Sequence, residues 1–573
     1  MRSSGSWGAG VIALVSAAVG WSCAASDTNP GGQGGAGAGE LGGATSTSGG
    51  MAGTAGGAAG STGSFGLGGA GAGGPVDLCK VNEADLDTPP PCELSAPSDS
   101  FDPVVQWQWS PPSSGAFFSG SLTTPLVGNF SDDNADGAID LCDVPDVVAL
   151  VFTAEVSMAG EPVTYAGRVF ILSGDDGTQI AESALAVDAN INPAFGDLDG
   201  DGVPEIVAAT TQQQVVAFEH DGSVHWLGGF GSWPDLDTFS SGNLGAYCHA
   251  FAIYDLDADG SPEILGGFDV FGNDGALKWS ATGGLNDLPG EPFWCPTPTA
   301  ADLDGDGTLE VLYGHAAYRS DGTLLWQVPG LNPGHPHVAN FDDDPDPEIL
   351  VHTDAGITLL EHTGAVKFGP VRPTGEAASA RCWGKPGVVH DFDGDGLADV
   401  ATGTCASYSV YDVSTTLTSA WSQPISDFSG LATGTAFDFL GDGVADAIYA
   451  DEQNAYVFDG ATGMQLLSVP RASGTLVEYP VVADVDNDAS AEIVVVSNAP
   501  GALLGPAVTV YRDSQDRWIP SRRVWNQHAY HVTNVREDGT IPQNMKKSWQ
   551  LLNTFRTNSQ VEAGGDCDPD PPR

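Results

Sequence analysis

The sequence of 573 residues predicts an all-β fold, a β-propeller of seven or eight four-stranded blades, with eight favoured. Three observations predict it. An acidic loop motif recurs eight times, β-branched runs flank the copies, and turn signals follow several of them. The copies begin at residues 132, 197, 255, 302, 340, 391, 438 and 484. Their mean spacing of about 50 residues lies in the range of propeller blades.

The loop motif is clearest in "FGDLDGDGVPEIV", residues 195–207. With Asp197 as position one, acids fall at positions one, three, five and nine, and Gly202 is at six. Four copies follow this frame without exception, and four depart from it, for example with Leu440 at position three or Ala489 at position six. The candidate metal ligands are Asp132, Asn134, Asp136 and Asp140; Asp197, Asp199, Asp201 and Glu205; Asp255, Asp257, Asp259 and Glu263; Asp302, Asp304, Asp306 and Glu310; Asn340, Asp342, Asp344 and Glu348; Asp391, Asp393, Asp395 and Asp399; Asp438, Asp442 and Asp446; and Asp484, Asp486, Asp488 and Glu492.

Electrostatics explains why these residue types would share one loop. Two carboxylates about 5 Å apart repel by roughly 3 kcal/mol at an effective dielectric constant near 20. A divalent cation reverses this sign, and Ca²⁺ accepts six to eight oxygen ligands with loose geometry, whereas Mg²⁺ demands a near-ideal octahedron. The sequence therefore predicts Ca²⁺ as cofactor, with up to eight ions. The alternative is that acidic turns only increase solubility, and it is strongest at Asp438–Asp446, where Leu440 replaces a ligand.

The residues that flank the loops predict strands. Runs such as "EIVAAT" and "EIVVVS" follow the last acid at position nine, so each loop joins two strands rather than two helices. Further along each unit, segments such as "QVVAFEHDGSVHWLG" and "AYRSDGTLLWQVPG" place Asp-Gly between apolar runs, a strong hairpin signal. Each unit thus holds about four strands, and residues 101–520 form the predicted propeller.

The N-terminal region predicts export and a tether. Residues 1–22 contain the short apolar run "GVIALVSAAVG" and read as a signal peptide. The stretch "VGWSC" resembles a bacterial lipoprotein cleavage site with Cys23 as the lipidated residue, and ordinary cleavage near Ala25 is the alternative. Residues 23–75 are mostly Gly, Ala, Ser and Thr and predict a disordered linker. Such a chain spans roughly 40 Å, enough to hold a domain away from a membrane.

Cysteines and charge limit the surroundings and the partners. Eight cysteines besides Cys23 suggest disulfides in an exported protein. Cys79 with Cys92, Cys248 with Cys295 and Cys382 with Cys405 are the plausible near pairs. A formal net charge of −56 makes nucleic acid and anionic membranes poor partners, so a lipid at Cys23 would be the contact with the membrane. We expect an outer-membrane or cell-surface lipoprotein, with secretion as the alternative.

Two segments lie outside the repeats. Residues 76–100 form a short lead-in that contains Cys79 and Cys92. Residues 521–573 are rich in aromatic, basic and amide side chains, as in "RRVWNQHAYHVTNVREDGTIP". This composition suits packing over the propeller or closing its ring, and contact with a ligand is the alternative.

The repeats resemble the FG-GAP or VCBS-type calcium repeats of the integrin alpha-subunit head and of bacterial surface proteins. Phe195 and Gly196 preserve the "FG" element, which most other units lack. The resemblance implies a calcium-binding propeller that serves adhesion or binds an extracellular protein or glycan. We therefore expect no enzyme. A structural envelope protein is a further alternative.

Catalytic alternatives rest on two features. Trp226, Trp279 and Trp326 each follow a hairpin glycine by four residues, which resembles the tryptophan-docking repeat of quinone-dependent dehydrogenases, although aromatic packing between blades explains it more simply. Calcium propellers also occur among rhamnogalacturonan lyases, and His335, His337 and His390 could then serve as a base. GxSxG, HExxH and P-loop signatures are missing from the sequence.

Overall fold

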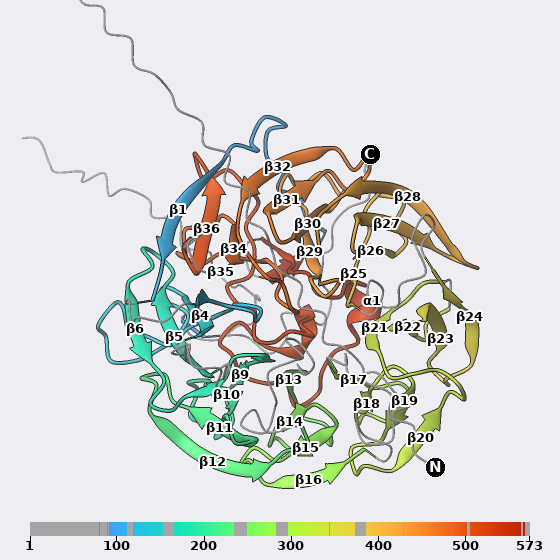
Figure 1. Ribbon diagram of the computed structural model, residues 1–573, viewed down its shortest axis with the longest axis horizontal. Coiled ribbons are helices and arrows are strands. Elements are labelled where there is room, and N and C mark those ends of the chain that lie inside the picture. Colours follow the sequence, from blue (N-terminus) through green and yellow to red (C-terminus); the bar gives the residue numbers. More distant parts are fainter. Residues whose placement is uncertain are drawn as a thin grey trace, which may run out of the picture. The chain divides into compact units, whose positions relative to one another are not determined.

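The computed structural model describes residues 79–80, 89, 91–111, 118–152, 166–233, 249–281, 296–342, 344–353, 355–372, 385–427, 429–500, 505–562 and 565–567. The signal peptide, the linker and Cys23 lie outside the described residues. Eight sheets, six of four strands and two with a short fifth strand, are arranged in a ring within residues 64–573, so the propeller with eight blades is confirmed (Figure 1). No helix among the described residues is long and apolar enough to cross a membrane.

Consecutive strands pair with one another in each of the first seven blades, and we number the blades along the chain. Blade 1 contains β3 (Leu126–Gly128), β4 (Asp146–Phe152), β5 (Ala166–Ser173) and β6 (Gln179–Glu182); blade 2 contains β9 (Ala194–Gly196), β10 (Glu205–Ala209), β11 (Gln214–Phe218) and β12 (Val224–Phe230). Blade 3 contains β13 (His249–Tyr254), β14 (Glu263–Gly266), β15 (Asp269–Phe271) and β16 (Leu277–Ser280); blade 4 contains β17 (Thr299–Ala301), β18 (Glu310–Leu312), β19 (Ala316–Tyr318) and β20 (Leu324–Gln327).

The second half of the ring repeats this pattern. Blade 5 contains β21 (His335–Ala339), β22 (Glu348–Thr353), β23 (Gly356–Glu361) and β24 (Val366–Val371); blade 6 contains β25 (Val388–His390), β26 (Asp399–Gly403), β27 (Ser407–Val413) and β28 (Leu417–Pro424). Blade 7 contains β29 (Gly434–Phe437), β30 (Asp446–Ala450), β31 (Asn454–Phe458) and β32 (Gln465–Pro470). Blade 8 contains β33 (Val481–Ala483), β34 (Glu492–Val496) and β36 (Val508–Asp513), with β1 (Pro103–Trp109) as its outer strand.

The two ends of the repeat region close the ring together. Strand β1, from the start of the propeller, pairs antiparallel with β36, and Pro103 faces Asp513 in the register. The indole of Trp107 on β1 then donates to the Gly174 carbonyl of blade 1, 2.6 Å away, and packs on Gly177. Strand β1 thus completes blade 8 and contacts blade 1, which closes the ring.

Tryptophans connect other neighbouring blades by the same contact. Trp279 and Trp326 donate to the carbonyls of Ser320 and His362, each at 2.9 Å, in the outer turn of the next blade. Trp226 packs against Gly275. A side chain at Gly275, or at Gly322 beside Trp279, would collide with the indole. Both glycines also have a positive φ, which is 82° at Gly322, and this conformation favours glycine. The structure therefore places the tryptophans of the repeat between blades, as aromatic packing predicts.

The core lies in the inner strands, whose β-branched and aromatic side chains are buried on both faces of each sheet. All residues of β9 and β10 are buried, whereas β12 on the outside of the same blade is largely half-exposed. Minor elements complete the fold: β2 (Phe118–Gly120) with β35 (Asn498–Pro500), β7 (Val187–Asp188) beside β5, β8 (Ile191–Asn192) parallel to β13, β37 (Gln560–Glu562) with β38 (Gly565–Cys567), a 3₁₀ turn at Val532–Asn534, and α1 (Ser548–Leu551).

The C-terminal segment from residue 521 lies at the centre of the ring of blades (Figure 1). Its backbone pairs with inner strands on different sides of the ring, through Trp525 with Val127 and Phe555 with Val389. Asn526 exchanges hydrogen bonds with Phe195, and Asn558 donates to the Val482 carbonyl. The segment thus packs on the inner strands of the propeller, while the ring itself is closed by β1.

The structure contradicts one of the three near pairs expected from the sequence and does not test the other two. Cys79 bonds to Cys142 and Cys92 bonds to Cys567, so the predicted pair of Cys79 with Cys92 is wrong. The physical reason is that the lead-in runs beside loops that are distant in sequence, 63 and 475 residues away. Cys405 is also disulfide-bonded, whereas Cys248, Cys295 and Cys382 lie outside the described residues. These bonds indicate an oxidising compartment.

Candidate metal centres

The acidic loops connect the innermost strand of a blade to the second strand. In blade 2, Asp197 directly follows β9, and its carboxylate accepts hydrogen bonds from the backbone N–H groups of Gly200 at 2.7 Å and Gly202 at 3.1 Å. Gly202 has φ of 92°, a conformation that a side chain would strain. The same contact from position six to position one recurs in blades 3 and 6, at 2.7 and 2.8 Å. The sequence thus folds these three loops around their first carboxylate.

The carboxylate at position nine begins the second strand and is buried. Glu205, Glu310 and Glu492 each expose 1% or less of their surface. One oxygen accepts a hydrogen bond from the backbone N–H of position two, for example from Leu303 to Glu310 at 3.0 Å. The other oxygen of Glu310 and of Glu492 is buried without a hydrogen-bond partner. A buried carboxylate oxygen without a donor is energetically costly unless a cation neutralises it.

The acids at positions three and five are mostly exposed, whereas the acids at positions one and nine are more buried. Asp197, Asp199 and Asp201 bring oxygens within 4.8 Å of one another, and the corresponding triads of blades 3 and 4 do the same. Glu205 lies within this distance of Asp199 and His225. These clusters of hard oxygen ligands can hold metal ions.

Burial and mutual repulsion leave these carboxyl groups poorly stabilised as anions. Burial raises the pKa of Asp399 in blade 6 to about 8, with further upward shifts from Asp393 and Asp412. Burial likewise raises the pKa of Glu205 and of Glu310 to about 7. A neighbouring divalent cation would favour the ionised forms and reverse these shifts.

Basic side chains already approach the loops of blades 3, 4 and 5. Lys278 on β16 forms an ion pair with Glu263. Arg319 lies 2.9 Å from Asp304 and 3.7 Å from Glu310. Lys367 on β24 lies 2.7 Å from Glu348 and also pairs with Asp342.

In blade 6, Asp412 on β27 lies near enough to Asp393 and Asp395 for their charges to raise its pKa after burial, and it faces Asp399 in the register as Glu361 faces Glu348 in blade 5. The four loops of blades 3 to 6 therefore share a sequence motif but differ in local charge.

Blade 1 has a longer loop than the others. Asp146, at the start of β4, receives the backbone hydrogen bond of Phe130 at 2.9 Å, which is the contact that position nine makes elsewhere. Asp140, which the sequence frame assigned to position nine, lies instead within the added residues and accepts a bond from the Cys142 N–H. The sequence frame missed Asp146, because it counted from Asp132 rather than from the end of β3.

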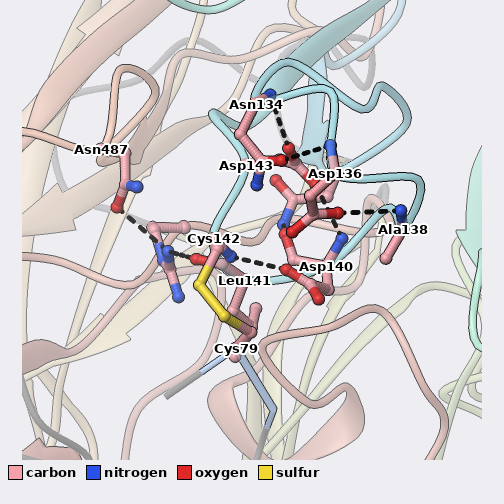
Figure 2. The surroundings of a disulfide bond; sticks show 11 residues. Cys79, Asn134, Asp136, Ala138, Asp140, Leu141, Cys142, Asp143 and Asn487 are labelled. Atoms are coloured by element: carbon pink, nitrogen blue, oxygen red, sulfur yellow. Dashed lines mark hydrogen bonds between the residues drawn. A yellow bond between two sulfur atoms is a disulfide. The ribbon is translucent and has the colours of Figure 1, made fainter. Parts of the chain in front are cut away.

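A second carboxylate of this loop also escaped the sequence frame. Asp143 is buried and accepts hydrogen bonds from the N–H groups of Asn134 at 3.2 Å and Asp140 at 2.9 Å (Figure 2). Counting from Asp132, Asp143 occupies position twelve, where the helix-flanked calcium loop has its last ligand. The Cys79–Cys142 disulfide anchors the neighbouring residue of this loop to the lead-in (Figure 2).

The irregular loop of blade 7 packs against two other segments of the chain. Ala96 of the lead-in donates a backbone hydrogen bond to the Leu440 carbonyl at 2.7 Å, and Ile519 donates to Phe439 at 3.1 Å. Asp438 and Asp446 are buried in this loop, and burial raises the pKa of Asp438 to about 6. The residue that replaces a ligand at position three thus contacts another segment of the chain.

The histidines that could act as a base are packed in the core. His337 contacts the Leu350 carbonyl at 2.9 Å and the backbone of Gly387, and burial lowers its pKa well below the usual value. His335 meets the Thr297 hydroxyl at 2.8 Å. Burial lowers the pKa of His390 to about 4. These positions suit packed, neutral imidazoles.

Fold and loops together define the class of the protein, an eight-bladed β-propeller with acidic loops that can hold metal ions. No protein-family model matches the sequence, so membership of the calcium-repeat family stays an expectation. No curated protein matches it either.

Solved structures with a similar fold include the biofilm matrix protein Bap1 of V. cholerae, with 22% identity and a TM-score of 0.64 over 80% of this chain and 99% of that one. The rhamnogalacturonan lyase YesW has 15% identity and a TM-score of 0.48, over 82% of this chain and 84% of that one. The exotype rhamnogalacturonan lyase YesX has 16% identity and a TM-score of 0.46, over 85% and 83%. Structural neighbours of the chain thus include both a matrix protein and polysaccharide lyases.

Proposed function

We propose that the chain is a calcium-binding, cell-surface propeller that acts as an adhesion or ligand-binding module for an extracellular protein or glycan. The carrying observation is the buried position-nine carboxylate with an oxygen that has no hydrogen-bond partner, as at Glu492. Ca²⁺ would supply the missing positive charge, held by carboxylates one, three, five and nine of a loop. Bound ions would fix the loops and thereby the blades that present the binding surface.

Location outside the cell follows from the disulfides, which persist in oxidising compartments. Lipidation at Cys23 and the linker of residues 23–75 would hold the propeller away from an outer membrane. The similarity in fold to a biofilm matrix protein is in keeping with such a role. The strong negative charge of the chain disfavours nucleic acid as a partner.

A binding experiment tests this function directly. The mature chain is applied to an array of glycans and cell-surface proteins, with Ca²⁺ and with Ca²⁺ removed by a chelator. The proposal expects saturable binding that needs Ca²⁺ and releases no product. Unsaturated sugars released from acidic polysaccharides would identify a lyase instead, and neither binding nor product would favour a structural envelope protein.

A matched pair of variants separates ion binding from folding. Asp391→Asn removes a first-position ligand in blade 6, and Asp176→Asn removes an exposed acid of the outer turn of blade 1. The first should lower the number of bound Ca²⁺ ions by one, as measured by equilibrium dialysis, and the second should leave it unchanged. Equal ion numbers in both variants and the native chain would contradict the assignment of the loop.

A further inference from the structure

The acidic loop of blade 2 has a histidine beside it. His225 on β12 lies with Asp199 and Glu205 in a cluster whose ligand atoms are all within 4.8 Å of one another. Its Nδ1 meets the Glu219 carboxylate at 2.5 Å, and its Nε2 lies 4.0 Å from the Asp199 carboxylate. The second distance is too long for a hydrogen bond. The cluster therefore brings one imidazole nitrogen and two carboxylates together without a direct bond between the nitrogen and Asp199.

Blade 5 shows a cation at the corresponding place. The strand registers of the two blades match, so Lys367 on β24 takes the position of His225 on β12. Its ammonium group forms ion pairs with three acids that correspond to those around His225, namely Asp342, Glu348 and Glu361 in place of Asp199, Glu205 and Glu219. The distances to Glu348 and Glu361 are 2.7 and 3.3 Å. The acids at these positions of a blade thus converge on a point that accommodates a cation.

The contact with Glu219 prepares His225 to act as a metal ligand. Because an ionised carboxylate only accepts hydrogen bonds, Nδ1 carries the proton in this contact, and the lone pair of the neutral imidazole lies on Nε2. Nε2 is the nitrogen on the side of Asp199. Histidines that bind metals commonly donate their other nitrogen to a carboxylate in this way. Glu219 therefore has the place of a hydrogen-bond partner that orients a metal ligand.

The nitrogen changes the kind of ion that this cluster favours. Ca²⁺ is bound by oxygen ligands, whereas an imidazole suits Zn²⁺ and other divalent transition metals. Ligand distances of about 2.0 to 2.2 Å place two ligand atoms of a tetrahedral Zn²⁺ site about 3.4 Å apart. A shift of about 0.6 Å would bring Asp199 to this distance from Nε2. The Asp199 side chain is 43% exposed, so little packing opposes such a shift.

We propose that Asp199, Glu205 and His225 of blade 2 bind a divalent transition-metal ion of the Zn²⁺ class. Glu219 orients the histidine. Three protein ligands leave a fourth position for water or for a donor group of a bound molecule. The His225 side chain is 23% exposed, so an ion can reach the cluster from solvent. The site uses two acids of a loop that we assign to Ca²⁺, but it does not require that the loops bind Ca²⁺.

The test is equilibrium dialysis of the mature chain against Zn²⁺ in a buffer with Ca²⁺, which suppresses weak Zn²⁺ binding to loops that offer oxygen ligands alone. The native chain should bind one Zn²⁺ ion more than His225→Gln. Glu219→Gln should weaken this ion about 10- to 100-fold. Lys367→His should add one ion, because it places an imidazole among the acids of blade 5. His362→Gln is the control, because His362 lies beside a single acid, Asp346, and its loss should leave the number unchanged.

Three outcomes would overturn the proposal. The first is an equal number of Zn²⁺ ions in the native chain and in His225→Gln, whose substitution lies on a half-exposed outer strand. The second is the same loss in His362→Gln, because binding would then follow the number of histidines rather than the cluster. The third is no added ion in Lys367→His, which would contradict the correspondence between the blades. Bound Ca²⁺ is counted in the same samples, so failure of the Ca²⁺ sites is distinguished from failure of the Zn²⁺ site.

Discussion

Blades 5 and 6 contain related loops that differ at position one, Asn340 against Asp391, and in the charges beside them. In blade 5, Lys367 contacts Asp342 and Glu348, and although burial opposes it, these contacts raise the lysine pKa. In blade 6, Asp412 takes the register position that Glu361 has in blade 5, but no described residue forms an ion pair with the acids of this loop. A loop with its own ammonium group has less need of a metal ion. The comparison teaches that a shared spacing of acids does not imply equal affinity for Ca²⁺.

Removal of Ca²⁺ should have the largest effect and should act first on blade 6. At free Ca²⁺ of 100 times the dissociation constant, each independent site stabilises the fold by about 2.7 kcal/mol. A chelator should therefore lower the melting temperature of the mature chain. It should also accelerate hydrogen exchange at β25 and β26 more than at β21 and β22. Equal acceleration in both blades would contradict the expected difference in their dependence on Ca²⁺.

A change of the charge beside a loop should shift the Ca²⁺ binding of blade 6 toward that of blade 5, and the reverse change should act in the opposite direction. Asp412→Lys places an ammonium group beside the carboxylates of blade 6 and should reduce the number of tightly bound Ca²⁺ ions by one. Asp412→Asn is the matched control, because it removes a charge without adding one. Lys367→Met in blade 5 should have the reverse effect and increase Ca²⁺ binding. Calorimetric titration measures both, and an unchanged ion number in Asp412→Lys would contradict the argument.

The contrast also shows how far the sequence predicts the sites. The acid spacing predicts the loops, since local hydrogen bonds such as Gly202 to Asp197 form within a few residues. Lys367 approaches Glu348 across the sheet, from a strand 19 residues away, and no rule within the loop reveals it. Asp143 and Asp146 were missed because the blade 1 insertion shifts the count. The burial of Arg556 likewise depends on contacts with several blades, which the basic composition of residues 521–573 does not reveal.

Some features of the fold follow from the local sequence, and others depend on contacts between residues that are far apart in the chain. Eight repeats with four strands follow from the spacing and the Asp-Gly turns. The pairing of β1 with β36 does not, because it joins residues about 400 positions apart with no shared motif. The Cys92–Cys567 bond likewise depends on where the lead-in passes the C-terminal hairpin.

The metal-free protein should lose stability as pH rises, and Asp399 of blade 6 should contribute to this loss. Asp399 has a folded-state pKa of about 8, above the value near 4 of an unfolded aspartate. Its contribution is therefore present below pH 4 and is lost as pH rises through 8, because the folded state binds the extra proton. The melting temperature measured in chelator should fall between pH 5.5 and pH 8.5. Asp399→Asn should flatten this slope, and saturating Ca²⁺ should remove it by replacing the proton.

The smallest expected effect concerns the glycine at position six, which blade 8 lacks. Ala489 adopts φ of 72°, and its N–H donates to Asp484 at 3.0 Å, as Gly396 does to Asp391 in blade 6. Ala489→Gly relieves a left-handed alanine, worth about 1 kcal/mol, but partly offsets this by increasing the entropy of the unfolded chain. A net gain of about 0.5 kcal/mol is expected in chemical denaturation. Gly396→Ala should show the opposite sign, because it imposes the same strain on blade 6. Destabilisation by Ala489→Gly would show that the two loops differ in backbone as well as in charge.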